Sequence, residues 1–196
     1  MTRYNILLAG VGGQGLLTLG SIIGNAAIEE GIDATIAETH GLSQRGGSLV
    51  VHVRLGDGSS PLIPHGGANL IIGLEALETL RYLNYANKDT KIVMNEFLWP
   101  PPLSKTPKLE DIIKAIGSSA RLYVVNANKE AKKVTGLIVT ANTLILGYAY
   151  MIDKDLQSLL SEKSLEKGLE RVFRGKALEL NRKALKAGME LAKKII

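Results

Sequence analysis

The feature that most constrains the fold is a glycine-rich turn between an apolar strand and a helix near the start of the chain. The residues from Tyr4 to Ala9 have the composition of a buried strand, and Leu16 to Glu30 has the pattern of a helix. Between them the sequence reads Gly-Val-Gly-Gly-Gln-Gly, from Gly10 to Gly15. A second strand is predicted over 32–38. This arrangement is typical of a βαβ unit, whose two strands run parallel and are joined by a right-handed crossover.

The rest of the chain continues to alternate between strand and helix patterns. Further strands are predicted over 48–55, 69–74, 91–95 and 122–125, and helices over 75–83, 109–116, 127–134, 138–151, 153–160, 164–173 and 177–194. The turn signal at 56–59 and the apolar residues at 61–63 predict a return strand antiparallel to 48–55. Alternation of this kind predicts an α/β fold, in the form of a Rossmann-like three-layer domain followed by C-terminal helices. The sheet should be mainly parallel, and the predicted hairpin would make it mixed. We expect one domain over 1–160 and a helical segment over 161–196 packed on it.

Two glycines in the first helix and one after it have structural roles. Gly20 and Gly24 are four residues apart, so they form a flat face that allows close approach to a sheet despite their low helix propensity. Gly31 stands where a helix-terminating glycine is usually found.

Composition excludes several classes of function. The chain of 196 residues contains no cysteine, so it forms no disulfide, carries no thiolate nucleophile and cannot by itself hold an iron–sulfur cluster. The absence of cysteine fits a reducing compartment, and no apolar run is long enough for a membrane span, so a soluble, cytoplasmic protein with no membrane partner is expected. The net charge of +5 lies in residues 161–196, where basic side chains alternate with apolar ones at helical spacing. That pattern indicates an amphipathic helix with a solvated face rather than nucleic-acid binding.

The glycine loop supports two interpretations. In the first, Gly10, Gly12 and Gly15 let the backbone turn tightly and bring the free amides of the helix start to an anion, normally a phosphate. In the second, they serve close packing alone. Glu38 follows Gly15 by 23 residues, where a dinucleotide-binding protein places the carboxylate that holds a ribose.

A second cluster of polar residues follows the second predicted strand, at the sheet edge where open α/β folds bind ligands. It contains His40, Ser43, Gln44 and Arg45, and ends in two glycines. Arg45 suits a phosphate or carboxylate, and His40 titrates near neutral pH. The alternative is a turn whose polar groups are satisfied locally. The spacing of the three histidines does not match a metal site, and Ser43 is not in a nucleophile elbow, so no metal is predicted.

Together these two loops resemble a known family, the gamma-type subunits of 2-oxoacid:ferredoxin oxidoreductases. The stretch from His40 to Gly47 resembles the form found in the small (beta) subunit of the indolepyruvate type. Weaker matches are Asn142 with Gly147 and Asn181 with Gly188. The resemblance covers most of the chain and is most specific over 9–54.

The resemblance implies a role within a larger enzyme. Such enzymes oxidatively decarboxylate a 2-oxoacid, here an aryl pyruvate, to an acyl-CoA and pass the electrons to ferredoxin. Thiamine diphosphate and iron–sulfur clusters belong to the large (alpha) subunit, which is the expected partner, and ferredoxin is reached only indirectly. The small subunit supports the active site and the coenzyme A pocket and is inactive alone.

The resemblance also assigns roles to residues. Gly10, Gly12, Gly13, Gln14 and Gly15 are the candidates for the cofactor-binding loop that faces coenzyme A. His40, Ser43, Gln44 and Arg45 are the candidates near the reaction centre.

Three alternatives stay open at this point. In one alternative, the chain is a free-standing NAD- or nucleotide-binding protein. In another, it is a scaffold whose glycine loop only packs against its partner. The isolated chain also has the option of forming a homodimer that covers its interface.

Overall fold

The computed structural model describes residues 3–40, 47–56, 58, 60–100 and 105–196. The strands are β1 (Tyr4–Val11), β2 (Ala34–His40), β3 (Ser48–Leu55), β4 (Leu70–Gly73), β5 (Lys91–Asn95) and β6 (Arg121–Val125). The helices are α1 (Leu16–Glu29), α2 (Ala76–Arg81), α3 (Leu109–Gly117), α4 (Ala127–Thr135), α5 (Ala141–Ile152), α6 (Lys154–Leu159), α7 (Glu162–Val172) and α8 (Gly175–Ala192), with 3₁₀ turns at Leu83–Tyr85 and Ile138–Thr140.

The strands form one mixed sheet in the order β2-β3-β1-β4-β5-β6. Strands β1, β4, β5 and β6 are parallel neighbours, whereas β3 runs antiparallel to both β1 and β2. The carboxyl ends of the four parallel strands therefore meet at one edge. The expected α/β fold with a mixed sheet is confirmed.

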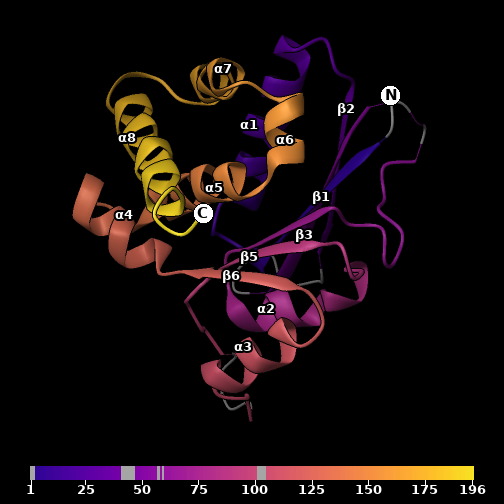
Figure 1. Cartoon of the computed structure of the whole chain (residues 1–196). Coiled ribbons are helices and arrows are strands. Elements are labelled where there is room, and N and C mark those ends of the chain that lie inside the picture. Colours follow the sequence, from indigo (N-terminus) through magenta and orange to yellow (C-terminus); the bar gives the residue numbers. More distant parts are fainter. Residues whose placement is uncertain (1–2, 41–46, 57, 59, 101–104) are drawn as a thin grey trace.

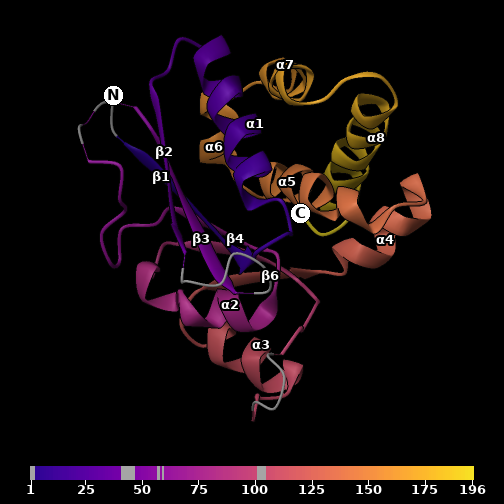
Figure 2. The ribbon, with the colours of Figure 1, turned by 180° about the vertical axis from the view of Figure 1, so that it is seen from behind.

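Helices cover both faces of the sheet, which gives the expected three layers (Figures 1 and 2). Along β1 the side chains alternate between the two faces, as strand geometry requires. Ile6 and Leu8 belong to the core under α1 and α5, and Leu7 belongs to the core over α2 and α3. All three side chains are fully buried, and burial of each such side chain stabilises the fold by about 1.5–3 kcal/mol.

Two features of the sheet differ from the sequence prediction. β1 and β2 run in the same direction, but they are not adjacent, because β3 lies between them. The predicted return strand at 61–63 is wrong: in the described part of 56–69 the chain forms no strand. The physical reason is that β3 already has β2 on one side and β1 on the other, so no edge of β3 is free for another partner.

The helices pack on the sheet and on each other through glycines. A Cβ at Gly20 would lie 3.3 Å from Val51 of β3, and one at Gly24 would lie 2.8 Å from Ile36 of β2, so the predicted flat face of α1 is confirmed. Farther from the sheet, α7 packs on α1 and α8 packs on α5. A Cβ at Gly147 or Gly188 would collide with the backbone of the opposite helix.

No single helix in the described parts of the chain is both long and apolar enough to cross a membrane. The segments Ala127–Thr135 and Ile138–Ile152 meet that test only as a pair bent by 120°. Nearly all residues of α5, the apolar part of this pair, are buried in the core.

Candidate functional site

The glycine loop connects the carboxyl end of β1 to the start of α1. Gly13 and Gly15 have φ angles of 101° and 80°, a region that side chains other than glycine rarely adopt. The amide of Gly12 donates to the carbonyl of Gly47, 2.9 Å away, which ties the loop to the residue before β3. Gly13 is exposed, and a Cβ placed on it would meet no atom within 4 Å. Its backbone is therefore open to a ligand.

Two pockets flank this loop. The strand-end pocket has a volume of about 270 Å³ and is lined by Gly13, Gln14, Leu74, Asn95, Phe97, Trp99, Asn128, Ile138, Val139, Ala141 and Asn142. The helix pocket has a volume of about 590 Å³ and is lined by Gly13, Gln14, Gly15, Thr18, Leu137, Val139, Thr140, Asn142, Phe173, Lys176, Ala177, Leu180 and Asn181. They share Gly13, Gln14, Val139 and Asn142, so both open beside the glycine loop. A mostly apolar lining with a few polar groups is typical of a small-molecule site.

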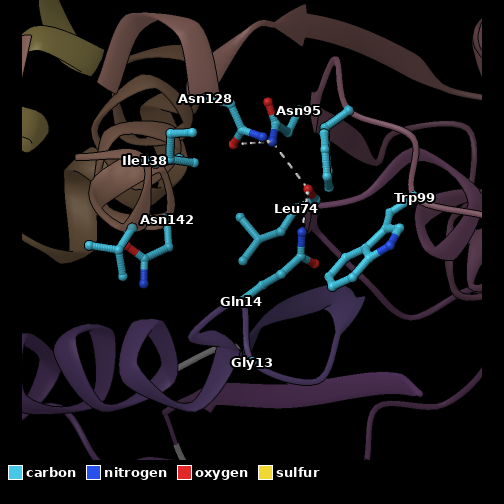
Figure 3. Close-up of a pocket in the computed structure, with 11 residues that line it drawn as sticks. Gly13, Gln14, Leu74, Asn95, Trp99, Asn128, Ile138 and Asn142 are labelled. Carbon is cyan, nitrogen blue, oxygen red and sulfur yellow. Dashed lines mark hydrogen bonds between the residues drawn. The ribbon is translucent and has the colours of Figure 1, made fainter. Parts of the chain in front are cut away.

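Carboxamide side chains brace the strand-end pocket (Figure 3). The amide group of Gln14 donates to the carbonyl of Leu74 at 3.2 Å, and Asn95 donates to the same carbonyl at 3.2 Å. Asn95 also donates to Asn128 at 3.1 Å and accepts from the amide of Ala127 at 2.9 Å. The ends of β1, β4 and β5 and the start of α4 are therefore fixed relative to one another.

A second polar network lies at the helix pocket, where the starts of α1, α5 and α8 approach. Asn142 donates to the carbonyl of Gly15 at 3.5 Å. The hydroxyl of Thr143 donates to Asn181 of α8 at 2.6 Å. A Cβ at Gly15 would come too close to the side-chain nitrogen of Asn142, which would have to move, and the φ of 80° also favours glycine here. Lys176, in the first turn of α8, supplies a positive charge to the pocket.

A buried carboxyl group holds the wall of the strand-end pocket. Glu75, the residue before α2, is 1% exposed and accepts from the amide of Trp99 at 2.9 Å and from that of Glu78 at 2.7 Å. Burial raises the pKa of Glu75, and the hydrogen bonds from these amides offset part of that rise. Glu75 thus fixes the backbone of Trp99, whose ring is half exposed beside the pocket.

The structure assigns different surroundings to the five residues predicted for the loop. Gly12, Gly13 and Gly15 form the turn. Gly10 lies beneath it, because a Cβ there would lie 2.6 Å from the side-chain oxygen of Gln14. Gln14 lines both pockets, but its oxygen accepts from the amide of Val11 at 2.7 Å and its nitrogen donates to Leu74.

The residues predicted near the reaction centre are described only in part. His40 is the last residue of β2, and nothing is described of its side chain. Ser43, Gln44 and Arg45 lie outside the described residues. Glu38 is exposed on β2, and since β3 separates β2 from β1, it lies two strand spacings, about 9.5 Å, from the line of β1. In dinucleotide-binding folds these two strands are adjacent, so the geometry does not favour a ribose contact by Glu38.

Several pocket residues were not predicted from the sequence. Asn95 is the last residue of β5, Trp99 follows that strand, and Ile138 and Val139 follow α4; the tertiary fold brings them to the loop. A signal for Asn95 was its position at the end of a predicted strand, and a signal for Ile138 and Val139 was an apolar run directly after a helix-ending glycine. Nothing in the sequence marked Lys176. In the described parts of the chain, no three His, Cys, Asp or Glu side chains are grouped as a metal site.

Comparisons by sequence identify a family. A family model described as pyruvate ferredoxin/flavodoxin oxidoreductase matches residues 5–191. The indolepyruvate oxidoreductase subunit IorB of Archaeoglobus fulgidus is 39% identical, over 97% of this chain and 96% of that protein. The IorB subunit of Thermococcus kodakarensis is 32% identical, over 100% of this chain and 99% of that protein.

Comparisons with solved structures agree on the fold. The gamma subunit of a keto/oxoacid ferredoxin oxidoreductase from Geobacter sulfurreducens superposes with a TM-score of 0.73 at 24% identity, covering 97% of this chain and 99% of that one. A 2-oxoglutarate:ferredoxin oxidoreductase from Magnetococcus marinus, solved with 2-oxoglutarate, coenzyme A and succinyl-CoA bound, superposes with a TM-score of 0.75 at 18% identity. It matches 100% of this chain but only 32% of that longer chain.

Proposed function

Because the chain belongs to the pyruvate ferredoxin/flavodoxin oxidoreductase family, we propose that it is the small subunit of an indolepyruvate:ferredoxin oxidoreductase. The observation that carries the proposal is 39% identity to an indolepyruvate oxidoreductase subunit over 97% of the chain. In the complete enzyme an aryl 2-oxoacid loses its carboxylate as CO₂, the acyl carbon forms a thioester with coenzyme A, and two electrons pass to ferredoxin. The resemblance assigns thiamine diphosphate and the iron–sulfur clusters to the large subunit. We place the complex in the cytoplasm, as the sequence predicts.

The contribution of this chain is a surface that holds coenzyme A beside the reaction centre. Coenzyme A supplies the thiol that accepts the acyl group. The residues present fit such a ligand: the loop backbone at Gly13 is open, and the helix pocket falls in the size range of small-molecule sites. Amides at the start of α1 suit a phosphate, and Lys176 would neutralise its charge. The apolar lining, which includes Val139 and Phe173, suits the uncharged arm of the ligand.

The test compares two glycines that differ in location but have similar backbone conformation. Gly13 and Gly31 have φ angles of 101° and 71°, and a Cβ at either meets no atom within 4 Å. Gly13→Ala and Gly31→Ala therefore both introduce backbone strain of about 1–2 kcal/mol without a clash. In the complex reconstituted with the large subunit under anaerobic conditions, we expect Gly13→Ala to raise the KM for coenzyme A at least tenfold. The KM of Gly31→Ala should stay within twofold of wild type.

The control for each variant is its thermal stability as an isolated chain, which should fall by a similar amount in both. Equal KM values for coenzyme A in the two variants would show that the glycine loop only packs. Stabilisation of the isolated chain by NAD, together with no indolepyruvate oxidation by the reconstituted complex, would overturn the proposal in favour of a free-standing nucleotide-binding protein.

A further inference from the structure

Large apolar side chains at the two pockets, and on the helices that lead to and from them, are exposed to solvent. They are Leu17, Trp99, Val134, Leu137, Ile138 and Val139, and we refer to them as the apolar rim. Trp99, Ile138 and Val139 line the strand-end pocket, and Leu137 and Val139 line the helix pocket. Leu17 belongs to the first turn of α1, and Val134 to the last turn of α4.

The centre of the rim is a run of three consecutive apolar residues, 137–139, each about half exposed or more. Val139 reaches 72% exposure. The run joins α4 to α5, and α4 projects from the edge of the molecule beside α8 (Figure 2). A protein that acts alone rarely keeps so many apolar side chains together in water, because burying apolar surface is favourable by about 25 cal/mol per Å². A contiguous apolar patch edged by polar groups marks an interaction site.

The rim is flanked by positive charge. Lys129, Lys132 and Lys133 lie exposed on α4, and Lys176 lies on α8, against which α4 packs. In the described parts of the chain none of these four lysines takes part in an ion pair. Other exposed lysines do pair: Lys167 with Glu29, and Lys186 with Glu166. The charges beside the rim are thus available to a partner.

We propose that the apolar rim and its lysines are the docking face for the large subunit, which presents an apolar centre edged by Asp and Glu side chains. This inference rests on the proposed function. It adds that both pockets lie under the interface, so that the large subunit closes them. A ligand held by the glycine loop then touches both chains and is shielded from water.

The shape of the face favours a protein over a lipid surface. Between the rim residues the surface is hollow, and the strand-end pocket has the carboxamides of Asn95, Asn128 and Asn142 in its wall. Asn95 and Asn142 use their carboxamides within the chain, whereas the described residues offer no partner to the side-chain nitrogen of Asn128. A flat hydrocarbon surface neither fills the hollow nor supplies that partner, and leaving a polar group without one is costly. The side chains of a protein partner do both.

The experiment measures binding of the large subunit to matched pairs of variants. Val139→Asp places a charge in the rim, and Ile28→Asp places one on another well-exposed apolar residue, 60% exposed, in the last turn of α1. Lys132→Glu with Lys133→Glu reverses the charge beside the rim, and Lys154→Glu with Lys163→Glu reverses two exposed lysines on α6 and α7. All these side chains are exposed, so the isolated variants should melt within about 2 °C of wild type, except the Lys132→Glu with Lys133→Glu variant. Those two lysines lie in the last turn of α4, where reversed charge opposes the helix dipole, so that variant should melt a few degrees lower while remaining folded.

We expect Val139→Asp to raise the Kd for the anaerobically prepared large subunit at least tenfold. Lys132→Glu with Lys133→Glu should also raise this Kd, and the Kd of that variant should depend less on salt concentration. Ile28→Asp and the α6–α7 reversal should change the Kd less than twofold. A complex that forms with wild-type affinity in the rim variants would overturn this inference and leave the proposed function intact. Absence of any complex with the wild-type chain would overturn both.

Two further outcomes would assign the rim to another occupant and so overturn the inference. One is a wild-type homodimer, seen by light scattering, that Val139→Asp dissociates while binding of the large subunit is unchanged. The other is co-sedimentation with vesicles of phosphatidylcholine and phosphatidylserine that Val139→Asp abolishes.

Discussion

Gln14 illustrates how one side chain fixes the shape of the candidate site. Its oxygen accepts from the amide of Val11 and its nitrogen donates to the carbonyl of Leu74, so both polar groups are used within the protein. The residue resembles part of a ligand-binding motif, yet its contacts are those of a group that positions the loop. On the proposed function, a ligand at Gly13 would depend on Gln14 through the backbone that Gln14 holds.

Replacing Gln14 by glutamate tests this role. The variant keeps an acceptor for Val11 but loses the donor to Leu74, so Gln14→Glu should lower the free energy of unfolding by about 1–3 kcal/mol at pH 7. Protonation of the new carboxyl at pH 4 restores a donor, so the loss should shrink there. Urea unfolding of wild type and variant at the two pH values measures this, and a loss that is the same at both would contradict the role.

His52 provides a second prediction at the residue scale, based on pH. The ring is 1% exposed, its Nδ1 accepts from the amide of Ile63 at 3.2 Å, and Tyr85 packs against it edge-on. Burial, with a smaller effect from the charge of Arg54, lowers the pKa of His52 below 6.5. The unfolded chain therefore takes up a proton at a higher pH than the folded one. The contribution of His52 to the free energy of unfolding is fully present above pH 6.5. It is lost as the pH falls toward the folded-state pKa, at a rate of no more than about 1.4 kcal/mol per pH unit.

His52→Asn offers a matched comparison, since an amide oxygen replaces Nδ1 as the acceptor. Unfolding free energies between pH 7.5 and 5.5 should fall more steeply for wild type than for the variant. Parallel curves would mean that His52 does not titrate differently in the two states.

At the scale of elements, the crossing of α5 and α8 sets the shape of the helix pocket. Gly147 meets the backbone of Leu185, and Gly188 meets that of Leu144, so the two helices touch without intervening side chains. The first turns of the same helices carry Asn142 and Lys176 into the pocket. Their spacing therefore controls the site as well as the core.

Gly147→Ala should lower the free energy of unfolding by about 1–3 kcal/mol, because overpacking against backbone outweighs the gain in helix propensity. Gly117→Ala on α3 is the control: a Cβ there would lie 4.0 Å from Leu122, an ordinary contact, and the variant should be as stable as wild type or slightly more. Chemical denaturation of both variants decides the point. A Gly147→Ala protein of wild-type stability would show that the helices can separate at little cost.

The sequence could predict where most helices and strands lie, but not the order of the strands in the sheet. Local patterns located the elements: the glycine turn ends β1, Glu75 begins α2, and Asn126 and Asp153 cap α4 and α6. The position of β3 between β1 and β2 could not be predicted, because strand order depends on contacts distant in sequence. For the same reason the glycine loop was found as a motif, whereas Asn95 and Val139 became part of the site only through the order of β4, β5 and β6.

At the scale of the whole molecule, residues far apart in sequence share one core. The cluster under α1 and α5 includes side chains from Tyr4 in β1 to Ala192 in α8. The hydroxyl of Thr143 in α5 donates to Asn181 of α8 at 2.6 Å, and Lys167 of α7 forms an ion pair with Glu29 of α1 at 2.8 Å. We therefore propose that the segment 161–196 and the segment 1–160 are one folding unit.

This proposal predicts a single unfolding transition. Trp99, the only tryptophan, reports on the sheet edge by fluorescence, while far-UV circular dichroism reports mainly on the helices, including α7 and α8. The two signals should change at the same urea concentration and give the same free energy. Loss of helical signal before the change in tryptophan fluorescence would show that the C-terminal segment unfolds by itself.

The central place of β1 has a consequence for how the protein is made. Its two neighbours are β3 and β4, and β4 ends only at Gly73. A ribosome adds about 5–20 residues per second, so roughly 3–12 s pass between the synthesis of β1 and that of its second neighbour. Until β4 is made, Ile6, Leu7 and Leu8 lie in a nascent chain that lacks at least one of their two neighbouring strands, within reach of chaperones. Strand β1, all eight residues of which are buried in the finished molecule, is thus the one that waits longest for its neighbours.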